Sequence, residues 1–223
     1  MHLHPEDRAR IGAAVVAAEA TTDGEIVAIV ARQSDAYHDV ALHWAVLALL
    51  FVVALLAALP GHGVPLLDPL SNGWEGDWSG GELLTALLVG MALVFLAVHY
   101  ATRPAGVRVA LTPGATKTRR VRARAVLLFR SAIEARTATA TGVLLYLSLA
   151  ERRAEIVADR AILSKVAPTE WGEAMAALVD GLREGRAGDG MVAAIERIGL
   201  VLARHFPHTG TDPNELPDGL IEL

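Results

Sequence analysis

The chain of 223 residues contains no cysteine. Disulfides, thiolate nucleophiles and metal sites with cysteine ligands are therefore excluded, and with them a cysteine-dependent phosphatase. The sequence also lacks GxxxxGK[ST], GxSxG, HExxH and an EF-hand loop, so the common nucleotide, hydrolase, zinc-protease and calcium-loop signatures are missing. A formal net charge of −5 gives no indication of a nucleic-acid partner, and we expect none.

Charged residues are absent from two long stretches of the chain. Val40–Leu59 and Leu83–Ala101 contain no Lys, Arg, Asp or Glu. Each is about as long as a helix needs to cross a hydrocarbon core of roughly 30 Å. We therefore expect two transmembrane helices. Because neither contains a charge that could relay protons or ions, the pair is typical of an anchor rather than a transporter.

The charges that flank these stretches predict an orientation. The loop 60–82 has four acidic residues and no Lys or Arg, whereas 102–124 has seven basic residues and no acid. Because positive residues stay on the cytoplasmic side, both termini are expected in the cytoplasm, with the protein in the inner membrane. The polar start of the chain does not resemble a cleaved signal peptide. The expected partners are the lipid bilayer and either another membrane protein or further copies of this chain.

The remaining sequence alternates between helix and strand patterns. Helices are predicted at 5–20, 122–136, 170–184 and 191–205, and short apolar strands at 25–31, 143–149 and 154–159. One strand before the membrane segments cannot be stable alone. We therefore predict a single small α/β domain that is split in sequence by a membrane hairpin.

The predicted organisation has seven parts. They are the first part of the α/β domain (1–39), transmembrane helix 1 (40–59), an acidic external loop (60–82), transmembrane helix 2 (83–101), a basic juxtamembrane segment (102–121), the second part of the domain (122–206) and an acidic disordered tail (207–223).

Three segments resemble the TPM domain family. They are Thr21-x-Asp23-Gly24-Glu25-Ile26-Val27, then Thr141–Arg153, and then Glu155–Ile162, with Val166 and Trp171 at the usual spacing. The resemblance covers about 5–39 and 122–206, and the inserted hairpin resembles a bacterial membrane-protein branch of the family. It implies an αβα sandwich with a small central sheet. Some members of the family are acid phosphatases and some bind calcium.

Two carboxylates and one arginine are the candidate site residues. Asp23 lies between a predicted helix and strand, and Asp159 ends a strand next to Arg160. Since ligands of α/β sheets gather at the carboxyl ends of strands, Asp23 and Asp159 could hold calcium or another divalent cation, with Asp159 and Arg160 acting on a phosphate ester. Alternatively, Asp23 bonds its own turn and Asp159–Arg160 form a surface ion pair. Glu151–Arg153 are predicted to form a solvated turn.

Two functions follow from these observations. The favoured one is a membrane protein that presents a cytoplasmic TPM-like domain as an interaction, assembly or regulatory module. The alternative is a metal-assisted phosphate-ester hydrolase. The sequence does not decide whether the chain is an enzyme.

Overall fold

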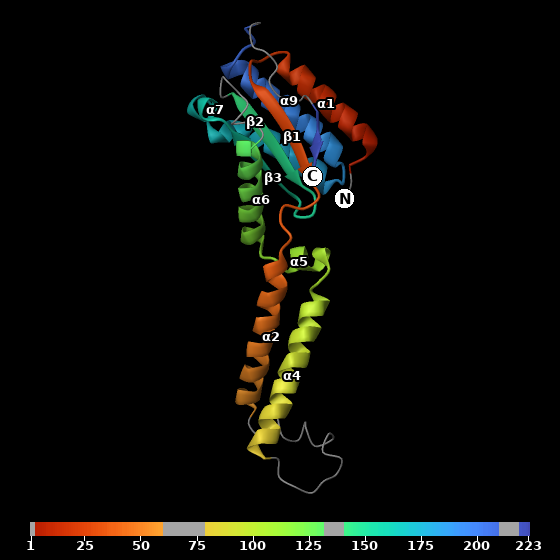
Figure 1. Ribbon diagram of the computed structural model, residues 1–223. Coiled ribbons are helices and arrows are strands. Elements are labelled where there is room, and N and C mark those ends of the chain that lie inside the picture. Colours follow the sequence, from red (N-terminus) through yellow and green to blue (C-terminus); the bar gives the residue numbers. More distant parts are fainter. Residues whose placement is uncertain (1–2, 60–78, 132–140, 210–218) are drawn as a thin grey trace. The chain divides into compact units, whose positions relative to one another are not determined.

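The computed structural model describes residues 3–59, 79–131, 141–209 and 219–223. The chain forms two compact units. One contains Met1–Asp35 and Pro113–Leu223, and the other contains Ala36–Thr112. The first unit is therefore assembled from two segments that are far apart in the sequence (Figure 1).

A four-stranded sheet of order β3-β2-β1-β4 forms the centre of the first unit. The strands are β1 (Glu25–Ala31), β2 (Gly142–Ser148), β3 (Arg153–Ala158) and β4 (Ile221–Glu222). β1 pairs with β2 and β4 in parallel, and β2 pairs with β3 in an antiparallel hairpin. The three predicted strands are confirmed, two of them one residue earlier than expected. Every residue of β1 and β2 is buried, which explains why these strands are continuously apolar.

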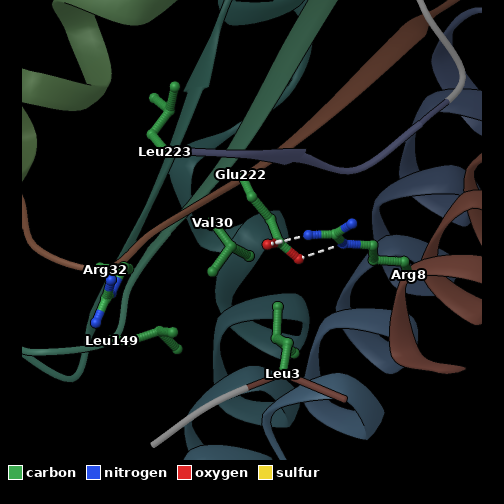
Figure 2. Close-up of a pocket in the computed structure, with 7 residues that line it drawn as sticks. All are labelled: Leu3, Arg8, Val30, Arg32, Leu149, Glu222 and Leu223. Atoms are coloured by element: carbon green, nitrogen blue, oxygen red, sulfur yellow. Dashed lines mark hydrogen bonds and ion pairs between the residues drawn. The ribbon is translucent and has the colours of Figure 1, made fainter. Parts of the chain in front are cut away.

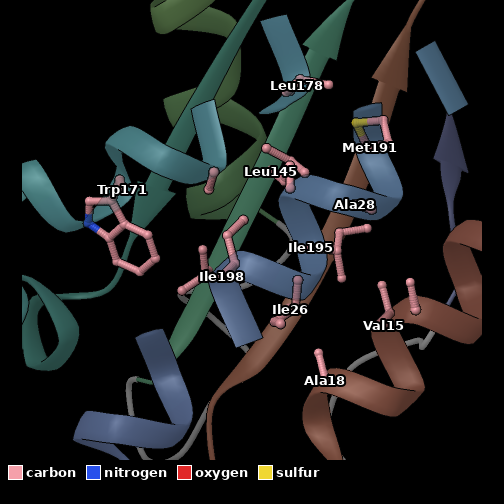
Figure 3. Close-up of a cluster of buried hydrophobic side chains, with 14 of the residues drawn as sticks. Val15, Ala18, Ile26, Ala28, Leu145, Trp171, Leu178, Met191, Ile195 and Ile198 are labelled. Carbon is pink, nitrogen blue, oxygen red and sulfur yellow. The ribbon is translucent and has the colours of Figure 1, made fainter. Parts of the chain in front are cut away.

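One face of the sheet is covered by three helices: α1 (Pro5–Glu19), α8 (Gly172–Arg183) and α9 (Ala187–His205). Alternate strand residues such as Ile26, Ala28 and Leu145 meet Val15 of α1 and Ile195 of α9 (Figure 3). These side chains belong to one large buried cluster. Fully burying a side chain of this size contributes about 1.5–3 kcal/mol, so this face holds most of the apolar stabilisation of the unit.

Helices α8 and α9 approach each other closely at two glycines. A Cβ atom built on Gly181 would lie 2.6 Å from Cα of Gly190. Similarly, a Cβ on Gly199 would lie 2.7 Å from Cβ of Ala18 in α1. These distances are shorter than van der Waals contact, so only glycine permits the observed packing at both positions.

The opposite face of the sheet is covered by α6 (Gly114–Phe129). Its residues Val121, Ala125 and Phe129 pack in a second buried cluster with strand residues that include Ile29 and Tyr146. Helices thus cover both faces of the sheet, and the predicted αβα sandwich is confirmed.

The structure corrects several predicted helix boundaries. The helix expected at 122–136 begins at Gly114, so much of the basic segment 102–121 is helical; residues 132–136 lie outside the described residues. Arg and Lys are good helix formers, and Pro113 directly precedes the first turn, where proline is tolerated. The last helix starts at Ala187 rather than at residue 191. The short helices α7 (Arg160–Lys165) and η3 (Pro168–Trp171) were not predicted.

The second unit contains the two charge-poor helices. These are α2 (His38–Ala58) and α4 (Gly80–Ala101), and they are followed by α5 (Ala105–Leu111). α2 and α4 have mean hydropathies of 2.6 and 2.2, and both are long and apolar enough to span a membrane. α4 begins three residues earlier than its predicted span because Ser79 and Glu82 form a capping box there. Most of the predicted loop 60–82 lies outside the described residues.

The C-terminal segment was predicted to be disordered, and for its described end this is wrong. Ile221 and Glu222 form β4 on the outer edge of β1, and Leu223 continues the pairing, with its amide donating to the carbonyl oxygen of Val30. Leu220 and Ile221 pack against the buried clusters on either face of the sheet. The acidic composition of the tail concealed this short apolar motif. Residues 210–218 lie outside the described residues.

Candidate functional site

The predicted site residues Asp23 and Asp159 lie at the same end of the sheet, where β1 begins and β3 finishes. Asp23 precedes β1, and Asp159 follows β3, which runs antiparallel to its neighbour. The amino ends of β1 and β2 and the carboxyl end of β3 lie here, so only Asp159 follows the carboxyl end of a strand, as the sequence predicted for both residues. For Asp23 the expected edge was therefore wrong, because a residue that precedes a strand lies at its amino end.

The carboxylate of Asp23 is bonded to the segment that follows α9. The backbone amide and the hydroxyl of Thr209 both donate to it, over 2.9 and 2.7 Å, and Nδ1 of His208 lies 3.1 Å away. The hydrogen bond from the Thr209 hydroxyl is the largest cause that holds the pKa of Asp23 below its ordinary value, and the bond from the Thr209 amide adds to it. The carboxylate thus joins the chain after α9 to the start of β1.

Asp159 fastens the end of the β2–β3 hairpin. Its buried carboxylate accepts a hydrogen bond of 3.0 Å from the amide of Gly142, and its own amide donates to the Gly142 carbonyl over 2.9 Å. The residue also occupies the position just before α7, while the neighbouring Arg160 is exposed on the first turn of that helix. Asp159 therefore stabilises the β2–β3 hairpin through hydrogen bonds to the backbone of Gly142.

Neighbouring backbone residues connect the surroundings of the two carboxylates. The hydroxyl of Thr141 donates to the carbonyl oxygen of Asp23 over 3.2 Å, and the next residue, Gly142, holds Asp159. The described residues contain no group of three or more His, Asp or Glu that could hold a metal ion. In this arrangement each carboxylate serves a separate structural hydrogen-bond network.

A polar network occupies the opposite end of the sheet, where β1 and β2 end. Glu151 accepts hydrogen bonds from the amide of Ser34, over 3.0 Å, and from the hydroxyl of Ser148. The hydroxyls of Ser34 and Tyr146 lie 3.0 Å apart. Burial raises the pKa of Tyr146, and the charge of Glu151 adds to the effect.

This network was not predicted from the sequence. Glu151 was predicted to lie in a solvated turn, and the structure buries it. The spacing Ser148-x-x-Glu151, in which a hydroxyl can reach the carboxylate across the turn, was the available signal. Arg152 in the same turn is exposed, as predicted, and has a positive φ of 51°.

A cavity of about 530 Å³ opens beside the carboxyl ends of β1 and β4 (Figure 2). Its walls combine apolar side chains with two arginines and one glutamate; they are Leu3, Arg8, Val30, Arg32, Leu149, Glu222 and Leu223. Arg8 and Glu222 form a two-pronged ion pair across it, with Nε of Arg8 donating over 2.6 Å. This pair lowers the pKa of Glu222 and fastens β4 to α1. The cavity lies where open α/β sheets commonly bind ligands.

The fold and the polar residues at both ends of the sheet define a class of protein. It is an α/β domain whose sequence is interrupted by a pair of apolar helices. A family model for the TPM domain matches residues 96–201, from the end of α4 into α9. A TPM domain is therefore present in this chain. β1 precedes the matched segment but pairs with β2 over all seven residues, so the N-terminal part completes the same sheet.

One solved structure resembles the whole chain. It is the NMR structure of the BA42 protein from the psychrophilic bacterium Bizionia argentinensis, with 17% sequence identity and a TM-score of 0.57. The likeness covers 100% of this chain and 97% of the other. At this identity the comparison supports the fold alone. No curated protein matches the sequence.

Proposed function

We propose that this chain is an integral membrane protein that presents its TPM domain at the cytoplasmic face of the inner membrane as an interaction or assembly module. The observation that carries the proposal is the exposure of the helical pair. Within their most apolar windows, α2 is 17% buried and α4 is not buried at all. Exposed apolar surface costs about 25 cal/mol per Å² in water, and a bilayer removes that cost.

The charge distribution supports the cytoplasmic side. The chain that follows α4 is rich in arginine, whereas the sequence between the two helices contains only acidic residues among its charges. Arginine-rich segments next to a span are retained on the cytoplasmic side. The domain would then lie in the cytoplasm because both of its sequence segments flank the helical pair.

The bonding of the carboxylates supports a binding role over hydrolysis. Asp23, Asp159 and Glu151 each accept hydrogen bonds that connect one chain segment to another. A hydrolase that used Asp23 and Asp159 for one cation would need carboxylate oxygens that in this structure accept hydrogen bonds from Thr209 and Gly142.

Topology reporters test the membrane placement. We would fuse a reporter that is active only in the cytoplasm after residue 223 in one version and within 60–82 in another. A cytoplasmic signal for the first fusion and none for the second is expected. The reverse pattern, or recovery of the protein in the soluble fraction, would overturn this part of the proposal.

A hydrolysis assay separates the two functions. Detergent-purified protein would be incubated with a phosphate ester, with and without calcium or magnesium, beside Asp159→Asn. Asparagine keeps an oxygen that can accept from Gly142, so the fold should persist while the negative charge is lost. We expect the unmodified protein to hydrolyse the ester no faster than the Asp159→Asn variant does. Turnover that disappears in the variant would establish the hydrolase instead.

A further inference from the structure

The first chain connection between the units is short. Asp35 lies only three residues before His38, where α2 begins. Three residues span at most about 11 Å. Asp35 in turn forms an ion pair of 3.1 Å with Arg120 of α6. If α2 spans the bilayer as proposed above, the length of this connection limits how far Asp35 can lie from the start of α2.

Positive charge is concentrated at this end of the domain. The α6 sequence Gly114–Phe129 contains five basic residues and no acidic residue. Arg119 and Arg122 are exposed and lie one turn apart on the helix. The β2–β3 turn adds the exposed Arg152 and the half-buried Arg153.

The turn and the helix form one surface. A Cβ atom on Gly114, the first residue of α6, would lie 3.3 Å from Nη2 of Arg153. Burial raises the pKa of Glu155, and the charges of Arg122 and Arg153 reduce this increase, so both arginines lie near the same carboxyl group. The Nε atom of Arg153 is buried and has no hydrogen-bond partner among the described residues. We call Arg119, Arg122, Arg152 and Arg153 the basic face.

We propose that the basic face binds the phosphate headgroups of anionic lipids and holds the TPM domain against the bilayer that anchors it. This inference rests on the proposed membrane anchoring. Each arginine near an anionic surface strengthens binding about fivefold, and the attraction falls off over a Debye length of about 8 Å at physiological salt. The guanidinium group suits phosphate because it donates two parallel hydrogen bonds.

The absence of cysteine allows a direct test on the full chain. Ala123 is exposed on α6, and Ala123→Cys would give a single labelling site. The labelled protein would be placed in nanodiscs of phosphatidylcholine alone, or with about one third phosphatidylglycerol, each with a headgroup-labelled acceptor lipid. We expect higher energy transfer in the anionic discs and loss of the difference in about 0.5 M NaCl.

Matched charge variants locate the contact. Arg119→Gln with Arg152→Gln should weaken docking about 25-fold and remove most of the increase that phosphatidylglycerol causes. Arg183→Gln with Arg204→Gln removes the same charge from the last turns of α8 and α9, and should leave the increase intact. Circular dichroism would verify that both variants are folded. An equal loss in both variants would overturn the proposal.

The assay separates the possible failures. If the protein is not recovered in either disc, the proposed anchoring is wrong. If it is recovered in both with equal energy transfer, anchoring stands and the basic face does not bind anionic lipid. Glycerol phosphate, compared with NaCl at equal ionic strength, should cause no additional release. Selective release by it would show a site for a soluble phosphate and overturn the lipid assignment.

Discussion

Helices α4 and α9 have similar lengths, 22 and 19 residues, but opposite surroundings. Ten residues of α9 are buried, and its charged side chains lie on the remaining surface. In α4, which is described in full, no residue is buried, and the apolar side chains continue around the whole helix. The comparison teaches that apolar periodicity, rather than apolar content, decides which partner a helix requires. A one-sided helix needs a protein core on one side, whereas a helix that is apolar all round needs apolar surroundings on every side, from protein or from lipid.

The largest effect is expected from a charge on the buried side of α9. Ile195 is fully buried, whereas Leu200 on the same helix is 69% exposed. Ile195→Asp should lower the free energy of unfolding by about 4 kcal/mol or more, because an unpaired carboxylate would enter the core. Leu200→Asp should change it by less than about 0.5 kcal/mol. Denaturant unfolding in detergent, followed by circular dichroism, measures both. Equal effects would mean that α9 is not one-sided.

A charge in the middle of α4 should be costly although the position is exposed. Leu93→Arg should raise the free energy of membrane insertion by about 2.5–3.5 kcal/mol. Leu93 is 62% exposed, so a soluble helix would tolerate the change, as we expect for Leu200 of α9. Leu84→Arg, near the start of α4, should cost less because the side chain can reach the interface. Membrane fractionation compares the two, and equal membrane recovery would argue against a spanning α4.

A methyl group should disrupt the contact between α8 and α9. Gly181→Ala would place Cβ within 2.6 Å of Cα of Gly190, so backbone must move, at a cost of about 1–3 kcal/mol in the free energy of unfolding. Gly172→Ala in the same helix has no atom within 4 Å of the new Cβ and should be neutral or slightly stabilising. Thermal unfolding of the two variants gives the difference, and a neutral Gly181→Ala would show that the helices can separate freely.

The smallest effect concerns acid stability at the Asp23 edge. Because the folded pKa of Asp23 is lowered, its contribution is fully present above the unfolded pKa of about 3.9 and is lost as pH falls through the folded value. Thr209→Val removes one donor and should shift the folded pKa upward, so part of that contribution disappears at every pH above 4. Melting temperatures between pH 3 and pH 7 would reveal this. If Thr209→Val leaves the difference in melting temperature between pH 7 and pH 3 unchanged, the stabilising role of the Asp23–Thr209 hydrogen bond is contradicted.

Much of the fold could be predicted because the signals are local. The strand at 25–31 is a β-branched run between a Thr-Asp-Gly break and polar residues, and the structure has it at the predicted bounds. Both apolar helices are recognised from their lack of charge. The parallel pairing of β1 with β2 joins residues more than 110 positions apart, and only the resemblance to TPM domains and the instability of a lone strand indicated it.

The candidate site was less predictable because it depends on which partners reach each carboxylate. The sequence placed Asp23 and Asp159 at strand ends, and the structure brings both to one edge. It could not show that Thr209 and Gly142 donate to them, since these bonds depend on how α9 ends and how the β2–β3 hairpin closes. Glu151 illustrates the same point, because its burial follows from the approach of Ser34.

Local sequence patterns were sufficient to identify the apolar helices, the buried strands and the dense positive charge after the second helix. These features depend on residue type and spacing along one segment, because helix and strand propensity and hydrophobic periodicity are properties of neighbouring residues. The tertiary structure alone decided the strand order, the pairing of the tail with β1 and the hydrogen-bond partners of each carboxylate. These depend on contacts between segments that are distant in sequence, and composition carries no information on which of many possible contacts has the lowest free energy.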